Sequence, residues 1–282
     1  MKLLLLLIIY AIPLFCCAQT DNPATGAKAV GMGNASATNA DAWALYNNVG
    51  ALGEVEEMNA LFAFDLRYGV VEFSTLSFGF VMPMSFGGVA GVSFSRFGDE
   101  IYNEQKIGLA YSHRISFMQV GAKVNYTQVA IDDQVGFVQG SRSALTFEVG
   151  GLATITPKLD FALHAYNLTQ STLRSETSEG DRLPVILKAG ASYKPIEKLW
   201  LNAEVEKDID YPALVKIGVN FEVIEKVSFR AGVNTNPFTN FFGIGFAPKR
   251  FSFDYALNTN TELGLSHHAS LRYRFKPKKR NG

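Results

Sequence analysis

Cysteine is nearly absent from this chain: the only two residues, Cys16 and Cys17, end an apolar stretch at its N-terminus. That stretch has a positive start, an apolar run from Leu3 to Leu14 and small residues up to Ala18. This pattern predicts a cleaved secretory signal peptide over residues 1–18. Without it, the chain has no thiol and can form no disulfide bond. A retained membrane helix and a lipid anchor on Cys17 are the alternatives.

Charge of one sign is not in excess either. The sequence has 26 Lys and Arg residues against 26 Asp and Glu residues. There is no basic surplus to recruit nucleic acid, so we predict no nucleic-acid partner. After the signal peptide, no apolar run approaches the roughly 20 residues that a membrane-spanning helix needs.

Motifs that carry chemistry are also scarce. Gly31-x-Gly33 lacks the third glycine and the preceding strand of a dinucleotide fingerprint. His267 and His268 are adjacent, so in a strand they point to opposite faces and cannot share a metal ion. No sequence feature joins the remaining histidines and serines to a carboxylate as a catalytic triad. We therefore predict a protein that is not an enzyme, with no catalytic, cofactor-binding or metal-binding residues.

What the sequence does have is 22 Phe, 11 Tyr and 25 Gly residues and, from about Met58, an alternation of apolar and other residues. Such a period of two predicts strands. Most of the segments are close to the ~9–11 residues with which a tilted strand crosses a bilayer. The fourteen segments span residues 58–66, 73–83, 88–97, 104–113, 116–128, 143–155, 159–168, 183–194, 198–206, 213–223, 227–235, 240–247, 250–258 and 265–275.

The connectors between these segments alternate in length. Short ones such as Arg114-Ile115 and Ile224–Lys226 alternate with longer polar ones such as Ile131–Arg142 and Thr169–Arg182. Short turns at one end and longer loops at the other are typical of outer-membrane barrels, and closure leaves no unpaired sheet edge in lipid. We therefore predict an all-β, 14-stranded antiparallel transmembrane β-barrel in lipid, in the outer membrane of a Gram-negative bacterium, with periplasmic termini. A soluble β-sandwich is the alternative.

The non-apolar phase of the strands carries few charges and many small residues, and we expect it to face the lumen. Glycine in a strand marks a bend or the close approach of another backbone, so these glycines either curve the wall or make room for a segment inside it. The charges are mixed in sign, which favours mutual pairing over an ion-selective ring. Positions assigned to the lumen include Gly108, Gly121, Glu148, Lys188, Gly190, Lys216, Gly218, Arg230 and Arg272.

The stretch from Ala29 to Leu52, AVGMGNASATNADAWALYNNVGAL, precedes the first strand and shows no alternation. It is small, nearly uncharged and able to enter a glycine-lined lumen, where Trp43 and Tyr46 would anchor it. We predict a plug there, with a short helix over Ala40–Tyr46 capped by Asn39. A periplasmic leader without fixed structure is the alternative.

A GMG turn, an Asp-Ala pair, a Leu-Tyr-Asn run and a final Gly-Ala-Leu mark this stretch. In these motifs it resembles the N-terminal hatch of the FadL superfamily and of the PorV/PorQ-like proteins of bacteria with a type IX secretion system. The resemblance implies a fourteen-stranded barrel that the hatch plugs. The chain departs from the family's Asn-Pro-Ala-Gly, because Asn47-Asn48-Val49-Gly50 has no proline. The residues that we predict for the hatch are Gly31, Gly33, Asp41, Trp43, Leu45, Tyr46, Asn47, Asn48 and Gly50.

The sequence thus predicts a signal peptide (1–18), a hatch or plug (19–57), a barrel (58–275) and a basic periplasmic tail (276–282). The PorV/PorQ-like resemblance implies a non-enzymatic accessory or scaffold role in protein secretion, with secretion-machinery proteins as partners. The alternative is a FadL-like passive transporter or binder of a hydrophobic small molecule.

Overall fold

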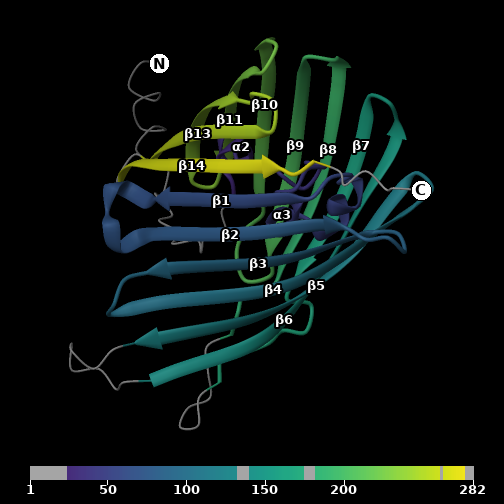
Figure 1. Ribbon diagram of the computed structural model, residues 1–282. Helices are drawn as coiled ribbons and strands as arrows, with labels where there is room; N and C mark the ends of the chain where they lie inside the picture. The colour runs from purple at the N-terminus through teal and green to yellow at the C-terminus, as the bar shows by residue number, and fades with distance from the viewer. Residues whose placement is uncertain (1–23, 132–139, 175–181, 261–262, 277–282) are drawn as a thin grey trace, which may run out of the picture.

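A computed structural model describes residues 24–131, 140–174, 182–260 and 263–276 of the chain. The predicted signal peptide and most of the predicted basic tail lie outside these residues. Fourteen antiparallel strands form a closed barrel in which each strand pairs with its neighbours in sequence and β1 pairs with β14 (Figure 1). Among the described residues, no helix has the length and apolarity needed to cross a membrane.

Every predicted segment coincides with one strand, and no boundary moves by more than three residues. The predicted fold class is therefore confirmed, and the soluble sandwich is excluded. The strands are β1 (Asn59–Leu66), β2 (Ser74–Pro83), β3 (Val89–Gly98), β4 (Tyr102–Ile115), β5 (Met118–Ile131), β6 (Gly140–Thr156), β7 (Leu159–Tyr166), β8 (Ile186–Ile196), β9 (Leu199–Asp208), β10 (Leu214–Ile224), β11 (Val227–Thr235), β12 (Phe238–Phe246), β13 (Phe251–Asn260) and β14 (Gly264–Arg274).

Burial along the strands is inverted relative to a soluble protein. In β9 the inward positions Asn202, Glu204 and Glu206 are buried, whereas the outward Leu201 and Val205 are exposed. The other strands repeat this alternation, so the outer wall is a belt of exposed aliphatic and aromatic side chains. An apolar exterior around a polar interior is the pattern that lipid imposes on a barrel.

The two ends of the barrel differ in their connections. We call the end with the connections 84–88, 116–117, 157–158, 197–198, 225–226 and 247–250 the tight-turn rim. The opposite end, the loop rim, has longer connections such as 67–73 and 167–185. Shifts in strand register occur only near the tight-turn rim, as between Glu222 and Ile224, so the ladder of the described wall is continuous between the rims.

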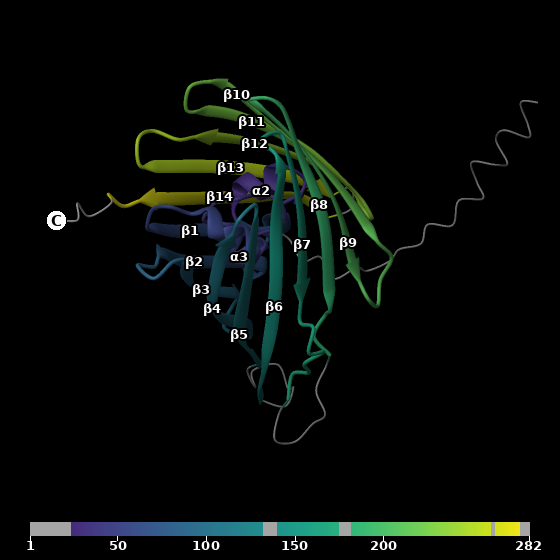
Figure 2. The ribbon, with the colours of Figure 1, turned by 90° about the vertical axis from the view of Figure 1, so that its right-hand side faces the viewer.

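One side of the wall is taller than the rest. Strands β4, β5 and β6 have 14, 14 and 17 residues, and at the loop rim β6 extends past β7, whose pairing with it stops at Glu148 (Figure 2). There Leu173 and Leu183, from the connection between β7 and β8, pack against Val129 and Ala144. The loop rim is therefore partly covered by its own connection on this side.

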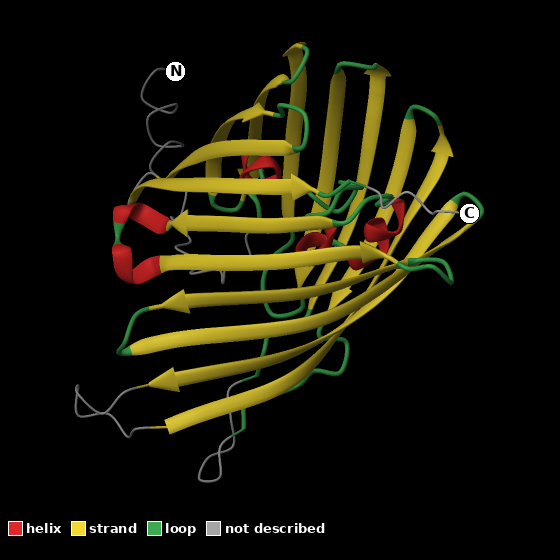
Figure 3. Cartoon of the chain, in the orientation of Figure 1, coloured by secondary structure: helices red, strands yellow, loops and turns green. Residues whose placement is uncertain are grey.

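The N-terminal segment, residues 24–57, lies inside the barrel. It contains α2 (Ala27–Gly31), α3 (Ala44–Asn47) and the 3₁₀ helix η1 (Val49–Glu54). Figure 3 shows these short helices enclosed by the strands, apart from η2 and η3 (Arg67–Gly69 and Val71–Phe73), which join β1 to β2. α2 packs on β12, β13 and β14, whereas η1 packs on β4, β5 and β6. The segment thus spans the lumen from one wall to the other.

The predicted helix over Ala40–Tyr46 with Asn39 as its cap is wrong in its start. The helix begins at Ala44, after a turn in which the Asp41 carboxylate accepts a hydrogen bond from the backbone N–H of Trp43, at 2.9 Å. Short polar side chains compete with helical hydrogen bonding in this way. The Asn39 side chain instead accepts a hydrogen bond from Asn202 of β9, at 3.1 Å.

Glycines in the wall leave room for the backbone of the N-terminal segment. A Cβ added to Gly150 would lie 2.0 Å from Asn48 Oδ1, and one added to Gly218 would lie 2.2 Å from Met32 O. At Gly121 the nearest atom would be Val49 O, at 2.5 Å. No side chain fits at these distances, so at these positions the glycines permit close approach and do more than curve the wall.

We expect Gly150→Ala to loosen the N-terminal segment and Gly151→Ala to be tolerated. The two residues are adjacent in β6, but a Cβ on Gly151 would have no neighbour nearer than 3.4 Å. Overpacking typically costs about 1–3 kcal/mol. The measurements are the temperature at which the folded form is lost on a gel and the rate of trypsin cleavage after Lys28. Equal unfolding temperatures and cleavage rates for the two variants would contradict the close packing of the segment against Gly150.

Candidate functional site

The candidate site is the lumen, where the N-terminal segment meets the wall through buried hydrogen bonds. Asn48 is fully buried, and its amide donates to Ala37 O at 2.7 Å and to Gly151 O at 3.2 Å. Its side-chain oxygen accepts from the backbone N–H of Gly50, at 3.1 Å. One asparagine therefore ties two parts of the segment to β6.

Asn47 closes the segment on itself. Its side chain exchanges two hydrogen bonds with the backbone of Thr25, at 2.9 and 3.0 Å. At the other side of the lumen, the backbone N–H of Ala27 donates to Ser270 Oγ of β14, at 3.0 Å. The segment is thus fixed at both ends, which favours a static insert over a loose chain.

Glu204 of β9 is a charged contact between wall and segment. One of its carboxylate oxygens accepts hydrogen bonds from the backbone N–H groups of Ser36 and Ala37, at 2.9 and 2.7 Å. The other oxygen lies 3.3 Å from Lys216 Nζ. Hydrogen bonds to a buried carboxylate are roughly twice as strong as neutral ones.

Glu204 belongs to a chain of buried ion pairs along β8, β9 and β10. Lys216 Nζ also lies 2.7 Å from Glu206, which lies 3.4 Å from Lys188 Nζ. All four side chains are nearly inaccessible to solvent. Because each charge has an opposite neighbour, the desolvation cost of burial is offset locally. Lys188 and Lys216 are therefore paired structural charges in this arrangement.

A second buried cluster centres on Glu148 of β6. Its carboxylate accepts from Asn125 at 2.6 Å and lies 3.1 Å from His164 Nε2 and 3.8 Å from Lys123 Nζ. Glu148, His164 and Lys123 border a polar cavity of about 80 Å³ on one side of the N-terminal segment. A space of this size suits a few water molecules.

The apolar part of the lumen lies around α3 and η1. Trp43, Leu45 and Leu52 are buried there against inward residues such as Leu61 of β1 and Leu152 of β6. Leu45 fills the space beside Gly79 and Gly91, where a Cβ on Gly91 would lie 2.6 Å from it. The leucine and tryptophan thus anchor the segment.

Tyr46 bonds to the wall with its hydroxyl, which donates to the backbone oxygens of Phe78 and Phe94, the latter at 3.1 Å. Burial raises the pKa of its phenol above the ordinary value, although the Phe94 hydrogen bond opposes this. Lys123 Nζ lies 5.3 Å from the centre of the Tyr46 ring, within the range of a cation–π contact.

Asp41 forms an ion pair within the segment. Its carboxylate lies 2.7 Å from Lys28 Nζ. Burial acts to raise the pKa of Asp41, but the positive charges of Lys28 and Arg272 outweigh it, so the pKa is below its ordinary value. Arg230, on β11, pairs with Asp254 at 2.8 Å.

The remaining glycines predicted for the site fall into two groups. Gly31 and Gly33 lie in the segment against β10, β11 and β12, where a Cβ on Gly33 would lie 2.9 Å from Ile217 O. Gly190 faces Ala37 at 3.3 Å. Gly108 differs, because a Cβ there would meet wall side chains, Lys123 and Asn125, and not the segment.

A further polar cluster, formed by Asp65, His268 and Asn258, has no recognisable pattern in the sequence. Asp65 of β1 lies 2.7 Å from His268 Nδ1, and the other ring nitrogen lies 2.8 Å from Asn258 Oδ1. These residues are 203 and 10 positions apart in the chain, so only barrel closure brings them together. Both nitrogens of His268 have partners, which suits a structural hydrogen-bond chain. No group of three metal-ligating side chains occurs among the described residues.

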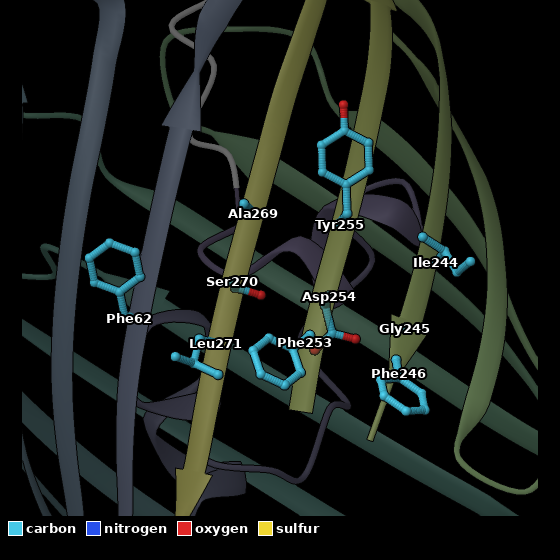
Figure 4. A pocket seen from close by; sticks show the side chains of 10 residues that line it. All are labelled: Phe62, Ile244, Gly245, Phe246, Phe253, Asp254, Tyr255, Ala269, Ser270 and Leu271. Atoms are coloured by element: carbon cyan, nitrogen blue, oxygen red, sulfur yellow. The ribbon is translucent and has the colours of Figure 1, made fainter. Parts of the chain in front are cut away.

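Two apolar hollows lie on the outer wall. One, of about 470 Å³, lies over β12, β13, β14 and β1, where the small Ala269 is surrounded by Phe62, Phe253, Tyr255 and Leu271 (Figure 4). Asp254 and Ser270, on the same strands, point to the other side. Another, of about 560 Å³, lies over β5 to β9. Both hollows open outward, away from the lumen.

We expect Glu204→Gln to destabilise the seated segment by about 2 kcal/mol, because it replaces charge-assisted hydrogen bonds and leaves Lys216 less compensated. Glu225→Gln, an exposed change in the turn between β10 and β11, is the matched control. Thermal unfolding and trypsin cleavage after Lys28 measure the effect. If the two variants unfold at the same temperature, Glu204 does not hold the segment.

Asp41→Asn should show the contribution of the Lys28 pair as a dependence on pH. Because the folded-state pKa of Asp41 is lowered, its contribution is complete above the unfolded pKa of about 3.9 and is lost as the pH falls through the folded value. The difference in Tm between the wild type and Asp41→Asn should therefore be constant above pH about 5 and shrink below about 4. A difference that grows on acidification would refute this pair.

Comparison with solved structures places the fold among hydrocarbon-transporter barrels at low sequence identity. The toluene transporter TbuX of Ralstonia pickettii has a TM-score of 0.71 at 14% identity, covering 90% of this chain and all of that one. The P. putida toluene transporter TodX gives 0.67 and 12%, covering 92% and 100%. A Pseudomonas aeruginosa FadL homologue gives 0.61 and 15%, covering 90% and 99%. At these identities, the likeness concerns the fold alone.

The sequence itself matches a protein family over most of the barrel. The family is described as "Type IX secretion system membrane protein PorP/SprF", and the match covers residues 69–273. No curated protein matches the chain. The PorV/PorQ part of the resemblance is not confirmed, whereas its FadL-like fold and its link to type IX secretion are. This chain is an outer-membrane β-barrel of the PorP/SprF family of type IX secretion system membrane proteins.

Proposed function

We propose that the protein is a non-enzymatic accessory or scaffold of type IX protein secretion, acting through its rims and not through an open pore. The observation that carries this proposal is the family match over residues 69–273, combined with a lumen that the N-terminal segment crosses. A barrel filled in this way has its two rims and its outer wall left for contacts.

The packing of the lumen supports a closed barrel. The segment touches both walls through backbone-to-backbone approaches at Gly150 and Gly218 and through the buried carboxylate of Glu204. The cavity beside Glu148 is polar and only about 80 Å³. A passing protein chain would need the segment to leave, which would expose these buried polar groups.

The N-terminal segment would be a hatch shared with PorV/PorQ-like proteins. The family match begins at residue 69, so it does not include the stretch from Ala29 to Leu52 that carries this resemblance. In this proposal the tight-turn rim and both termini face the periplasm, since short periplasmic turns are the rule in bacterial barrels.

The alternative is passive transport or binding of a hydrophobic small molecule. It draws on the fold of the toluene transporters and on the apolar hollow beside Ala269. That hollow lies on the outer wall, however, and the β12–β13 and β13–β14 ladders beneath it are continuous, with Gly245 opposite Asp254 and Asp254 opposite Ser270. A lateral path to the lumen would need a break in this wall.

Deletion of the gene separates the two functions. We expect the deletion strain to retain type IX substrates that the wild type releases into the medium, while its uptake of toluene is unchanged. Plasmid-borne wild-type chain should restore release. Normal release together with slower toluene uptake would overturn the accessory function and favour transport.

A further inference from the structure

A second luminal cavity, of about 280 Å³, lies between the N-terminal segment and the tight-turn ends of β8, β9, β11, β13 and β14. We call it the tight-turn cavity. Four cationic side chains line it, and no acidic side chain is among its lining residues; the cations are Lys28, Lys194, Arg230 and Arg272. The mixed charges elsewhere in the lumen make this one-sided lining distinctive.

Three of the four cations already have a carboxylate partner behind the cavity wall. Lys28 pairs with Asp41, Lys194 with Asp160 at 2.9 Å, and Arg230 with Asp254. Arg272 is the exception. Within the described residues, its guanidinium makes no hydrogen bond or ion pair, and the charge that it influences is Asp41, which Lys28 already neutralises. The cavity therefore retains one arginine without a direct hydrogen-bond or ion-pair partner among the described residues.

The rim around Arg272 adds to the positive field. The turn between β12 and β13 contributes Lys249 and Arg250, and the end of β14 contributes Arg274 and Lys276. The Arg274 side chain is held in place by a hydrogen bond to the backbone oxygen of Lys249, at 2.6 Å. Clefts lined by charges of one sign focus the field and attract oppositely charged ligands.

From these observations we propose that the tight-turn cavity binds a carboxylate side chain of an acidic peptide segment of a partner protein, with Arg272 as its main contact. A guanidinium presents paired donors that match a carboxylate. The side chains of Asn39 and Trp200 also line the cavity and offer polar and flat apolar contacts to a peptide.

The position and size of the cavity select this occupant. A lipid headgroup is excluded, because it is tied to the bilayer and the cavity lies within the wall. At about 280 Å³ the cavity is just below the usual size of a drug-sized ligand site, which suits one or two side chains. The inference rests on the proposed accessory function, since it names the chemistry of one partner surface.

The chain provides its own reporter for this site. It has two tryptophans, and Trp200 lines the cavity, whereas Trp43 is buried in the apolar part of the lumen. Hexaglutamate added to the purified full-length protein in detergent should change the tryptophan fluorescence in a saturable manner. Trp200→Phe should remove that signal, hexaglutamine should give none, and added NaCl should weaken binding.

Arg272→Gln should weaken hexaglutamate binding at least 10-fold. Arg114→Gln, which removes an arginine at the tight-turn rim on β4, away from the cavity, should leave it unchanged. If Arg272→Gln does not fold, Arg272→Lys keeps the charge without the paired donors and should show an intermediate loss. Equal binding by the Arg272→Gln and Arg114→Gln variants, or by hexaglutamine, would overturn the proposal.

Two further results decide the nature of the ligand. Binding of inorganic phosphate without binding of hexaglutamate would overturn a peptide occupant. Loss of peptide binding in Arg272→Gln with normal release of secretion substrates would overturn the partner role of the cavity, while the accessory function would stand. Loss of both in this variant, with release preserved in Arg114→Gln, is the result that we expect.

Discussion

A closed barrel has to satisfy its inward-facing polar groups without bulk water, and the structure of this protein follows from that constraint. Every second residue of each strand points into the lumen, and many of these are Asn, Ser, Lys, Glu or Asp. A buried charge is tolerated only with a partner. The lumen is therefore a network in which wall charges pair with one another and the backbone of the N-terminal segment supplies further donors, as it does to Glu204.

The network divides the lumen into two regions with different chemistry. Around β1 to β7 the segment contributes Trp43, Leu45 and Leu52 to an apolar cluster. Around β8 to β14 it contributes backbone, which small residues and wall glycines allow to come close, and a smaller apolar cluster in which Ala27 and Val30 meet Phe241 and Ala256. In this second region the carboxylate of Glu204 holds the segment by accepting hydrogen bonds from its backbone. Because two unlike mechanisms hold the segment, a change that weakens one of them loosens the segment and leaves the contacts of the other in place.

The strands were predictable from the sequence because a lipid-facing wall imposes strict alternation, and a slip of one residue would reverse every side chain. The small-residue stretch was also recognisable, since Trp43 and Leu45 interrupt an otherwise featureless run. The start of the helix was not predictable. The hydrogen bond from the Trp43 N–H to the Asp41 carboxylate competes with helical hydrogen bonding there, and helix propensity alone does not reveal it. The joining of Asp65 to His268 and of Glu204 to Ser36 could not be predicted either. These contacts depend on which strands close the barrel and on where the segment lies.

The hydrogen bonds of the N-terminal segment also order the events of folding. The amides of Ser36 and Ala37 bind a carboxylate 168 and 167 residues later, and that of Ala27 binds a serine 243 residues later. The binding partners of Ala27, Ser36 and Ala37 therefore do not exist until β9 and β14 have formed. Contacts of such separation form slowly, because much chain entropy is lost before they stabilise anything. Full docking of the segment thus depends on β9 and β14 being in place, and a barrel that closed without its segment would enclose a water-filled lumen.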